Sequence, residues 1–140
     1  MAPRSTRGTA DGRYSLYSEG VTEENFLRGV QVADDDGWLQ FTTVFPGCYP
    51  GRWPHVHVEV YPSVDDATTA SHRLRTSQLA LPQDVCGAVY AEAGYEGSTG
   101  NLGQLSLDSD TVFADGHSLQ LARVTGSVGA GYRATLALPV

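Results

Sequence analysis

A short stretch of the chain combines side chains that can bind a metal ion with a turn that restricts the backbone. Residues 45–57 read FPGCYPGRWPHVH, and here prolines fix φ while glycines permit backbone shapes closed to other residues. Such a turn can aim Tyr49, Arg52, His55 and His57 at one place. On a strand, residues two apart point the same way with Cα atoms about 6.5 to 7 Å apart. His55 and His57 can therefore share a metal ion, although two ordinary surface or core histidines fit this spacing equally well.

The third ligand decides which metal such a site would hold. Glu59 lies on the histidine face and would suit zinc, which takes Cys, His, Asp and Glu ligands. The phenolate of Tyr49 is instead a hard anionic oxygen donor, which favours a high oxidation state such as ferric iron. A tyrosine with a pKa of about 10 must lose its proton to bind, and a trivalent cation can drive this loss. The residue types alone leave both metals open.

The elements that would position these side chains are mainly strands. WLQFTTVF (38–45) is rich in aromatic and β-branched residues and is bounded by Asp-Gly and Pro-Gly. PHVHVEVY (54–61) alternates strictly, with both histidines on one face and three valines on the other. SLQLARVTG (118–126) and GYRATLALPV (131–140) predict a closing hairpin or a pair of neighbouring strands.

One short helix is expected at residues 82–93. Pro82 suits the first helical position, Asp84 lies in the first turn, and Val85 and Val89 stand at i and i+4.

Turn-rich segments connect these elements. Segments 62–75 and 94–117 contain many Gly, Ser, Asp and Asn residues, and Asp34, Asp35 and Asp36 before a glycine predict a solvated turn. Strands with long turn-rich connections indicate an all-β chain, a β-sandwich with one short helix, rather than an α/β fold.

Composition narrows the classes of function. The 140 residues suffice for one domain, and 41% hydrophobic content fits a folded protein. A net charge of −7 without a basic stripe argues against nucleic-acid binding. No apolar stretch reaches the roughly eighteen residues of a membrane span. Cys48 and Cys86 either form a single disulfide or are two independent reduced thiols.

The stretch FLRGVQVADDDGWLQFTTVFPGCYPGRWPHVHVEVY resembles the core of the intradiol ring-cleavage dioxygenases, relatives of protocatechuate 3,4-dioxygenase and catechol 1,2-dioxygenase. The similarity is strongest to their compact, single-domain bacterial branch. It continues through TSQLALPQDVCGAVYAEAGY and SDTVFADG to GYRATLALPV, so that it covers about residue 11 to the C-terminus. A tyrosine in a P-G-x-Y turn followed by Arg-x-x-His-x-His is a highly specific motif. The resemblance implies a β-sandwich that holds a non-haem Fe(III) between two tyrosines and two histidines.

The resemblance also implies a role for individual residues. His55 and His57 match the histidine ligands, and Tyr49 matches the displaceable tyrosine ligand. The second tyrosine ligand is expected at Tyr14, in DGRYSLYS, with Tyr17 as its rival.

Two further residues match the substrate side of the family's site. Arg52 matches the active-site arginine and Gln78 a glutamine near the substrate pocket. Plain structural roles are the alternatives: a loop aromatic for Tyr14, a strand residue for Gln78, and a surface ion pair of Arg52 with Glu59 or an aspartate. Trp53 is expected to pack in the interior, and His72 and His117 to be exposed to solvent.

The implied activity is that of an oxidoreductase in aromatic compound catabolism. It would cleave a catechol-type diol with O2, between the two hydroxyl-bearing carbons, to a cis,cis-muconate-type product. The alternative is a non-catalytic β-sandwich module derived from a dioxygenase, which acts in binding or structure and could still hold a metal. Partners would be the small-molecule diol and O2, and a homo-oligomer is left open.

The N-terminal segment departs from the family pattern. MAPRSTRGTADGR is polar and has no strand character, whereas family members have further strands before the first tyrosine. We expect residues 1–10 to be a disordered or truncated segment and residues 11–140 to form the dioxygenase-like domain. No signal peptide is recognisable at this start, so the localisation stays open between the cytoplasm and, for a longer chain, secretion.

Overall fold

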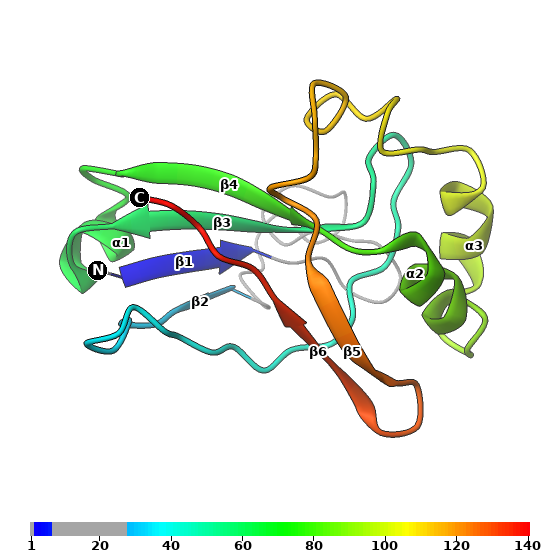
Figure 1. Cartoon of the computed structure of the whole chain (residues 1–140), viewed down its shortest axis with the longest axis horizontal. Helices are drawn as coiled ribbons and strands as arrows, with labels where there is room; N and C mark the ends of the chain where they lie inside the picture. The colour runs from blue at the N-terminus through cyan, green and yellow to red at the C-terminus, as the bar shows by residue number, and fades with distance from the viewer. Residues whose placement is uncertain (1, 7–27) are drawn as a thin grey trace.

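The computed structural model describes residues 2–6 and 28–140, and two antiparallel sheets dominate it (Figure 1). The larger sheet has the strand order β2-β1-β3-β4, and the smaller one is the β5-β6 hairpin. These sheets confirm the predicted β-sandwich. The strands are β1 (Ala2–Thr6), β2 (Arg28–Val30), β3 (His55–Tyr61), β4 (Arg75–Ala80), β5 (Arg123–Ser127) and β6 (Gly131–Thr135).

Strand β3 is the predicted histidine strand, and it lies between two neighbours. It pairs with β1 on one side and with β4 on the other, both antiparallel. In the β3–β4 ladder, His57 stands directly opposite Gln78. Residues opposite each other in such a ladder point to the same face of the sheet. The register therefore places Gln78 on the face that holds both histidines.

Three strand predictions need correction. Residues 38–45 form no ladder with any described strand, although their composition suited one. The closing hairpin is confirmed, but its strands are shorter than the predicted ranges 118–126 and 131–140. Residues 2–6, judged to lack strand character, form β1 in the interior of the larger sheet.

The failure at residues 38–45 has a physical reason. Aromatic and β-branched residues suit a pleated, half-buried surface, but a strand also needs a hydrogen-bonded neighbour. Here Trp38 is 69% exposed and Val44 is 47% exposed. The preceding aspartate turn is confirmed: the carboxylate of Asp34 accepts hydrogen bonds from the amides of Asp36 and Trp38, and Gly37 has φ +83°.

The predicted helix is α2 (Gln83–Tyr90), which is shorter than the expected range 82–93. Pro82 is its N-cap and not its first helical residue. Two short helices were not expected, because α1 (Val64–Thr69) and α3 (Glu96–Leu102) lie in the segments judged turn-rich. Ser63 caps α1 by accepting a hydrogen bond from the amide of Asp66.

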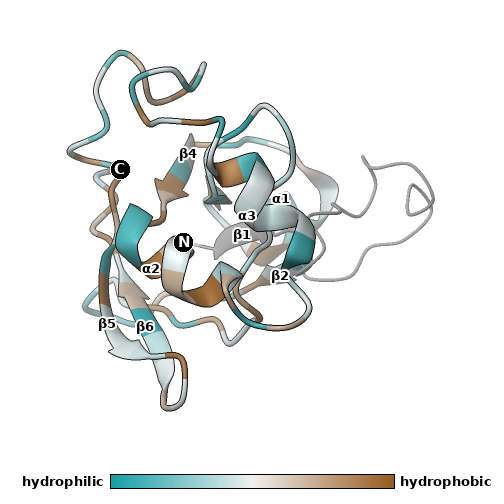
Figure 2. Cartoon of the chain, turned by 90° about the vertical axis from the view of Figure 1, so that its right-hand side faces the viewer, coloured by the Kyte–Doolittle hydropathy of each residue, from teal (hydrophilic) through white to brown (hydrophobic). Residues whose placement is uncertain are grey.

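Among the described residues, the buried hydrophobic side chains form three small clusters. Helices α2 and α3 lie together at one end of the larger sheet, beyond the end of β4 (Figure 1). Seen from that end, α2 has both hydrophobic and hydrophilic segments (Figure 2). Its buried residues pack with the turn before β3, and the cluster comprises Cys48, Leu81, Cys86, Val89 and Tyr90.

Within the described part of the chain, no helix has the length and apolar character needed to cross a membrane.

Candidate metal centre

The turn before β3 is held along its backbone by side chains from α2, from α3 and from Tyr95, the N-cap of α3. Its carbonyl oxygens accept hydrogen bonds from two tyrosines and an asparagine, and a serine hydroxyl accepts one from an amide of the turn. Each bond joins groups more than forty residues apart, so the two helices fix the path of the chain that leads to Tyr49. The hydroxyls of Tyr90 and Tyr95 donate to the carbonyl oxygens of Pro46 (2.9 Å) and Phe45 (2.8 Å). The Asn101 amide donates to the Cys48 carbonyl oxygen (2.8 Å), and the Cys48 backbone amide donates to Ser98 Oγ (2.9 Å).

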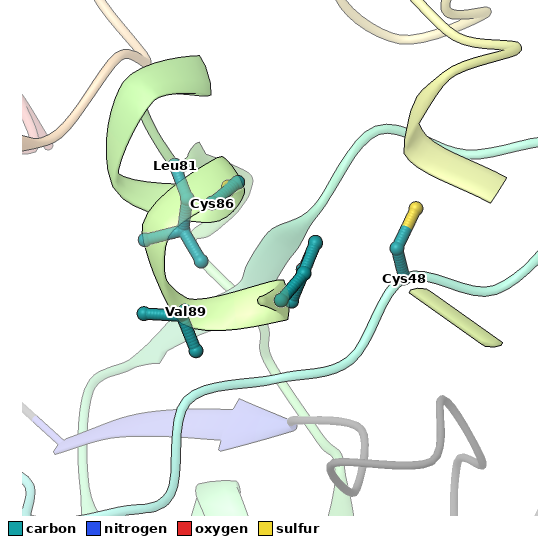
Figure 3. Close-up of a cluster of buried hydrophobic side chains, with 5 residues drawn as sticks. Cys48, Leu81, Cys86 and Val89 are labelled. Carbon is teal, nitrogen blue, oxygen red and sulfur yellow. The ribbon is translucent and has the colours of Figure 1, made fainter. Parts of the chain in front are cut away.

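Cys48 and Cys86 are both free and buried, so the structure contains the two reduced thiols and not the disulfide. Figure 3 shows them on separate segments, Cys48 on the turn and Cys86 on α2, within one cluster of buried side chains. Burial raises the pKa of Cys48 to about 11 and that of Cys86 to about 12. Both thiols therefore act as small apolar groups that pack the turn against α2.

His55 is buried, with its ring orientation set by its neighbours. Its Nδ1 lies 2.6 Å from the carbonyl oxygen of Trp53. A carbonyl can only accept, so Nδ1 carries the proton and Nε2 carries the lone pair. The rings of Tyr49 and Phe113 meet the imidazole edge-on, with centroids at 6.2 and 6.4 Å. Burial lowers the pKa of His55 to about 4, so the imidazole is neutral at pH 7, as a metal ligand must be.

His57 points to the same face of β3, but it is engaged by Glu59. Its Nε2 donates to Glu59 Oε1 over 3.2 Å. The same carboxylate accepts hydrogen bonds from Tyr61 Oη at 2.6 Å and from the guanidinium of Arg73 at 2.8 Å. Burial would raise the pKa of Glu59, yet these hydrogen bonds outweigh it and hold the pKa below its usual value. Glu59 is thus an ionised carboxylate with three partners.

Tyr49 is half-buried, and its ring meets that of His55 edge-on. Burial raises the pKa of Tyr49, while the nearby positive charge and hydrogen bond of Arg52 act in the opposite direction. The phenol is therefore protonated at neutral pH, and a metal ion would have to drive its ionisation.

Arg52 is held at two points of its guanidinium group. Its Nε donates to Asp110 Oδ2 over 2.9 Å, and its Nη2 donates to the Gln78 side-chain oxygen. Gln78 is thus a strand residue that also contacts Arg52. The ion-pair alternative for Arg52 is correct in that its partner is an aspartate, but the pair is not on the surface. The side chain of Arg52 is 20% exposed and that of Asp110 is fully buried.

Asp110 is the residue of this region that the sequence did not reveal. One oxygen accepts hydrogen bonds from Arg52 Nε and from the Trp53 amide at 2.7 Å, and the other from the Val112 and Phe113 amides. Burial would raise the pKa of Asp110, but the bonds from Arg52 and from the Trp53 and Val112 amides hold the pKa below its usual value. The only signal in the sequence is an aspartate in the turn-forming run SDTVFADG, which is typical of many loops.

The remaining predicted residues have mixed outcomes. Tyr14 and Tyr17 lie outside the described residues. Trp53 is 2% exposed and packs with Ala80 and Phe113, as expected. His72 is exposed, as expected, and binds Asp66. His117 was expected to be exposed, but its side chain is only 30% exposed.

These residues can be compared with the two metal sites that the sequence left open. Among the described residues, no three His, Cys, Asp or Glu side chains come together as a metal site. Glu59 is turned to Tyr61, Arg73 and His57, which does not suit the zinc site. The donor set for ferric iron fits better, because the phenol of Tyr49 and the neutral, tautomer-fixed His55 lie in ring contact. His57 follows on the same face.

Three solved structures that share this fold are dioxygenases. An intradiol ring-cleavage dioxygenase from Tetranychus urticae superposes with a TM-score of 0.75 and 20% identity, over 96% of this chain and 68% of that chain. A second dioxygenase superposes with a TM-score of 0.71 and 20% identity, over 89% of this chain and 63% of that chain. The third is the dioxygenase domain of a dioxygenase–carbohydrate-binding protein fusion from Streptomyces sp. SirexAA-E. It superposes with a TM-score of 0.58 and 22% identity, over 96% of this chain and 64% of that chain. Neither a family model nor a curated protein matches the sequence.

The chain has the fold of the intradiol ring-cleavage dioxygenases, as its sequence motifs predicted. It spans between 63% and 68% of the length of the solved chains that it resembles. At these identities the likeness shows the fold alone, and activity has to be argued from the residues.

Proposed function

We propose that this chain is a non-haem Fe(III)-dependent dioxygenase that cleaves a catechol-type aromatic diol with O2 between its hydroxyl-bearing carbons. The product would be a cis,cis-muconate-type diacid that contains both atoms of O2. The observation that supports this most is the grouping of Tyr49, Arg52 and His55 at the turn before β3, on a dioxygenase fold.

Tyr49, His55 and His57 would hold the iron together with Tyr14. His55 would bind through Nε2, because its Nδ1 is committed to the Trp53 carbonyl. His57 would exchange the Glu59 carboxylate for the metal or bind through its other nitrogen. Bound ferric iron would supply a Lewis acid for the two oxygens of the diol and would make a ring carbon open to attack by O2.

Tyr49 would also accept a proton from the diol. A catechol has two phenolic protons, and both must leave before it can chelate a metal. The Tyr49 oxygen could accept one of them as the tyrosine gives up its place to the diol, and the other would pass to solvent. Burial favours the neutral phenol of Tyr49, so the proton is retained at that oxygen.

Arg52 would stabilise the negative charge that develops on the ring. Its guanidinium lies beside Tyr49 and is held by Asp110 and Gln78, so little reorganisation is needed when charge appears. Preorganised donors of this kind contribute about 2.7–4 kcal/mol to other transition states. Gln78, opposite His57 in the ladder, would form part of the substrate wall.

The direct test is O2 uptake and muconate absorbance after iron loading, with unsubstituted and ring-substituted catechols. We expect one O2 consumed per diol, and a His57→Ala variant without iron or activity. His72→Ala is the matched control, because that histidine is exposed at its own surface site. An iron-loaded protein that cleaves none of these diols would favour the non-catalytic β-sandwich module.

A further inference from the structure

Asp110 is a buried carboxylate whose two oxygens face different parts of the molecule. Oδ2 accepts from Arg52 Nε at 2.9 Å and from the Trp53 amide at 2.7 Å. Oδ1 accepts from the amides of Val112 at 2.8 Å and Phe113 at 3.2 Å. All four donors point at one side chain that is fully buried, so Asp110 joins the 110–113 turn to the turn before β3.

Two paths lead from this carboxylate to the candidate site. The first runs through Arg52, whose guanidinium continues to Gln78 on β4 and to Tyr49. The second runs through the Trp53 peptide, because Asp110 binds its amide while the Trp53 carbonyl accepts the Nδ1 proton of His55. One carboxylate therefore constrains both Arg52 and the residue that sets the His55 tautomer.

We propose that Asp110 is a positioning residue that fixes the guanidinium of Arg52 toward Tyr49 and fixes the Trp53 peptide that orients His55. This rests on the proposed function for its catalytic consequence. The hydrogen-bonding role itself concerns the protein alone. Asp110 touches neither the substrate nor the metal in this proposal.

Asp110→Asn separates this role from mere space filling. The asparagine has the same shape but only one acceptor oxygen, and an NH2 donor replaces the other oxygen. If the oxygen stays with the Val112 and Phe113 amides, the NH2 group faces Arg52 Nε and the Trp53 amide, which are donors too. In this orientation the guanidinium of Arg52 is released. In the reverse orientation a neutral amide oxygen replaces the carboxylate, so the bond from Arg52 Nε weakens.

The experiment measures the Arg52 Nε–H group by NMR in the metal-free protein, with Arg52→Lys to assign its resonance. In the wild-type chain, Arg52 Nε–H should exchange with solvent at least about tenfold more slowly than that of exposed Arg75. Asp110→Asn should remove this protection. Asp115→Asn is the matched control, since it makes the same chemical change at an exposed position five residues away.

Two results would overturn the proposal. One is wild-type Arg52 Nε–H exchange as fast as that of Arg75, a comparison that stands even if Asp110→Asn fails to fold. The other is a folded Asp110→Asn protein in which the protection persists. In iron-loaded protein we expect kcat to fall about tenfold or more with KM changed less than threefold, because misplaced groups cost rate. If no iron binds and no diol is cleaved, the proposed function fails while the NMR comparison still decides the role of Asp110.

Discussion

The polar side chains at the two ends of strand β3 have different surroundings. At the first end, His55 is 4% exposed, and its ring is fixed by the Trp53 carbonyl and by two aromatic rings. At the second end, Glu59 gathers Tyr61, Arg73 and His57, and the Arg73 side chain is 51% exposed. Both ends are hydrogen-bonded and both hold a buried aromatic side chain, but at the second end the carboxylate of Glu59 also pairs with a half-exposed arginine.

This difference suggests how the site is divided. A buried histidine with a fixed tautomer is ready to bind a metal without reorganising, and its protons are already placed. His57 sits between the two ends and is paired with a carboxylate that has two other partners. His55 and its neighbours should therefore determine metal binding and stability, and loss of the Glu59–Arg73 ion pair should have a small cost.

The largest effect should follow from His55→Ala. We expect iron content to drop from about one per chain to near zero, because the fixed ligand is lost. The Trp53 carbonyl would also lose its donor, which costs about 1–3 kcal/mol of unfolding free energy. Metal analysis and urea denaturation measure the two effects. His72→Ala should change neither, and iron retained in full by His55→Ala would refute the ligand assignment.

Arg52→Ala should lower the free energy of unfolding more than His55→Ala does. It leaves Asp110 as a buried carboxylate without its cation, which typically costs about 3–5 kcal/mol. Arg73→Ala breaks the exposed ion pair with Glu59 and should cost under about 1 kcal/mol. Denaturation of the two variants side by side compares the two ends of β3 directly. Equal losses would show that burial does not distinguish them.

The pH dependence of the free energy of unfolding should come mainly from His55. The folded chain holds the pKa of His55 at about 4, against an ordinary value of 6.5. Between pH 6.5 and 4, His55 is protonated in the unfolded chain but stays neutral in the folded chain. The free energy of unfolding therefore decreases as pH falls. The free energy of unfolding of the metal-free protein should drop by about 3 kcal/mol between pH 6.5 and 4.

His55→Gln is the control for this titration, since glutamine cannot be protonated there. Its unfolding free energy should change much less over the same window. Below pH 4, Asp110 and Glu59 should add a further loss in both proteins, because both pKa values are held low in the folded state. A wild-type curve that is flat from pH 6.5 to 4 would contradict a neutral buried His55.

The smallest effect is expected for Glu59→Gln. Its hydrogen bonds to Tyr61 and His57 can be partly kept, so iron content should stay within about twofold and stability within about 1 kcal/mol. Metal analysis after growth with iron and with zinc tests this. Loss of metal on Glu59→Gln would instead favour a site built from His55, His57 and Glu59.

The sequence predicted β3 and α2 because their side-chain periods are strong and local. Strict alternation at 54–61 needs no knowledge of the neighbours, and the same holds for the valines at i and i+4 in α2. Residues 38–45 have strand-forming side chains too, but whether a strand forms depends on a partner backbone. The polar residues 2–6 show the converse, since an interior place in the sheet made them a strand.

The candidate site divides in the same way. Tyr49, Arg52 and His55 stand in one short motif, so their types and spacing were readable together. Asp110 is 58 residues from Arg52, and Gln78 is 26 residues away. Gln78 was found only through the family resemblance. Asp110 was missed, because an aspartate in a turn gives no sign that it will be buried against an arginine.

The most direct test of the proposed iron site is the visible absorption spectrum of the purified protein, with iron analysis on the same sample. Tyrosinate bound to Fe(III) absorbs broadly in the visible range, so we expect a wine-red protein with about one iron per chain. Tyr49→Phe should shift and weaken this band, and Tyr132→Phe, a tyrosine of the β5-β6 hairpin, should leave it unchanged. A protein that stays colourless after iron is supplied would contradict the tyrosine–histidine iron site.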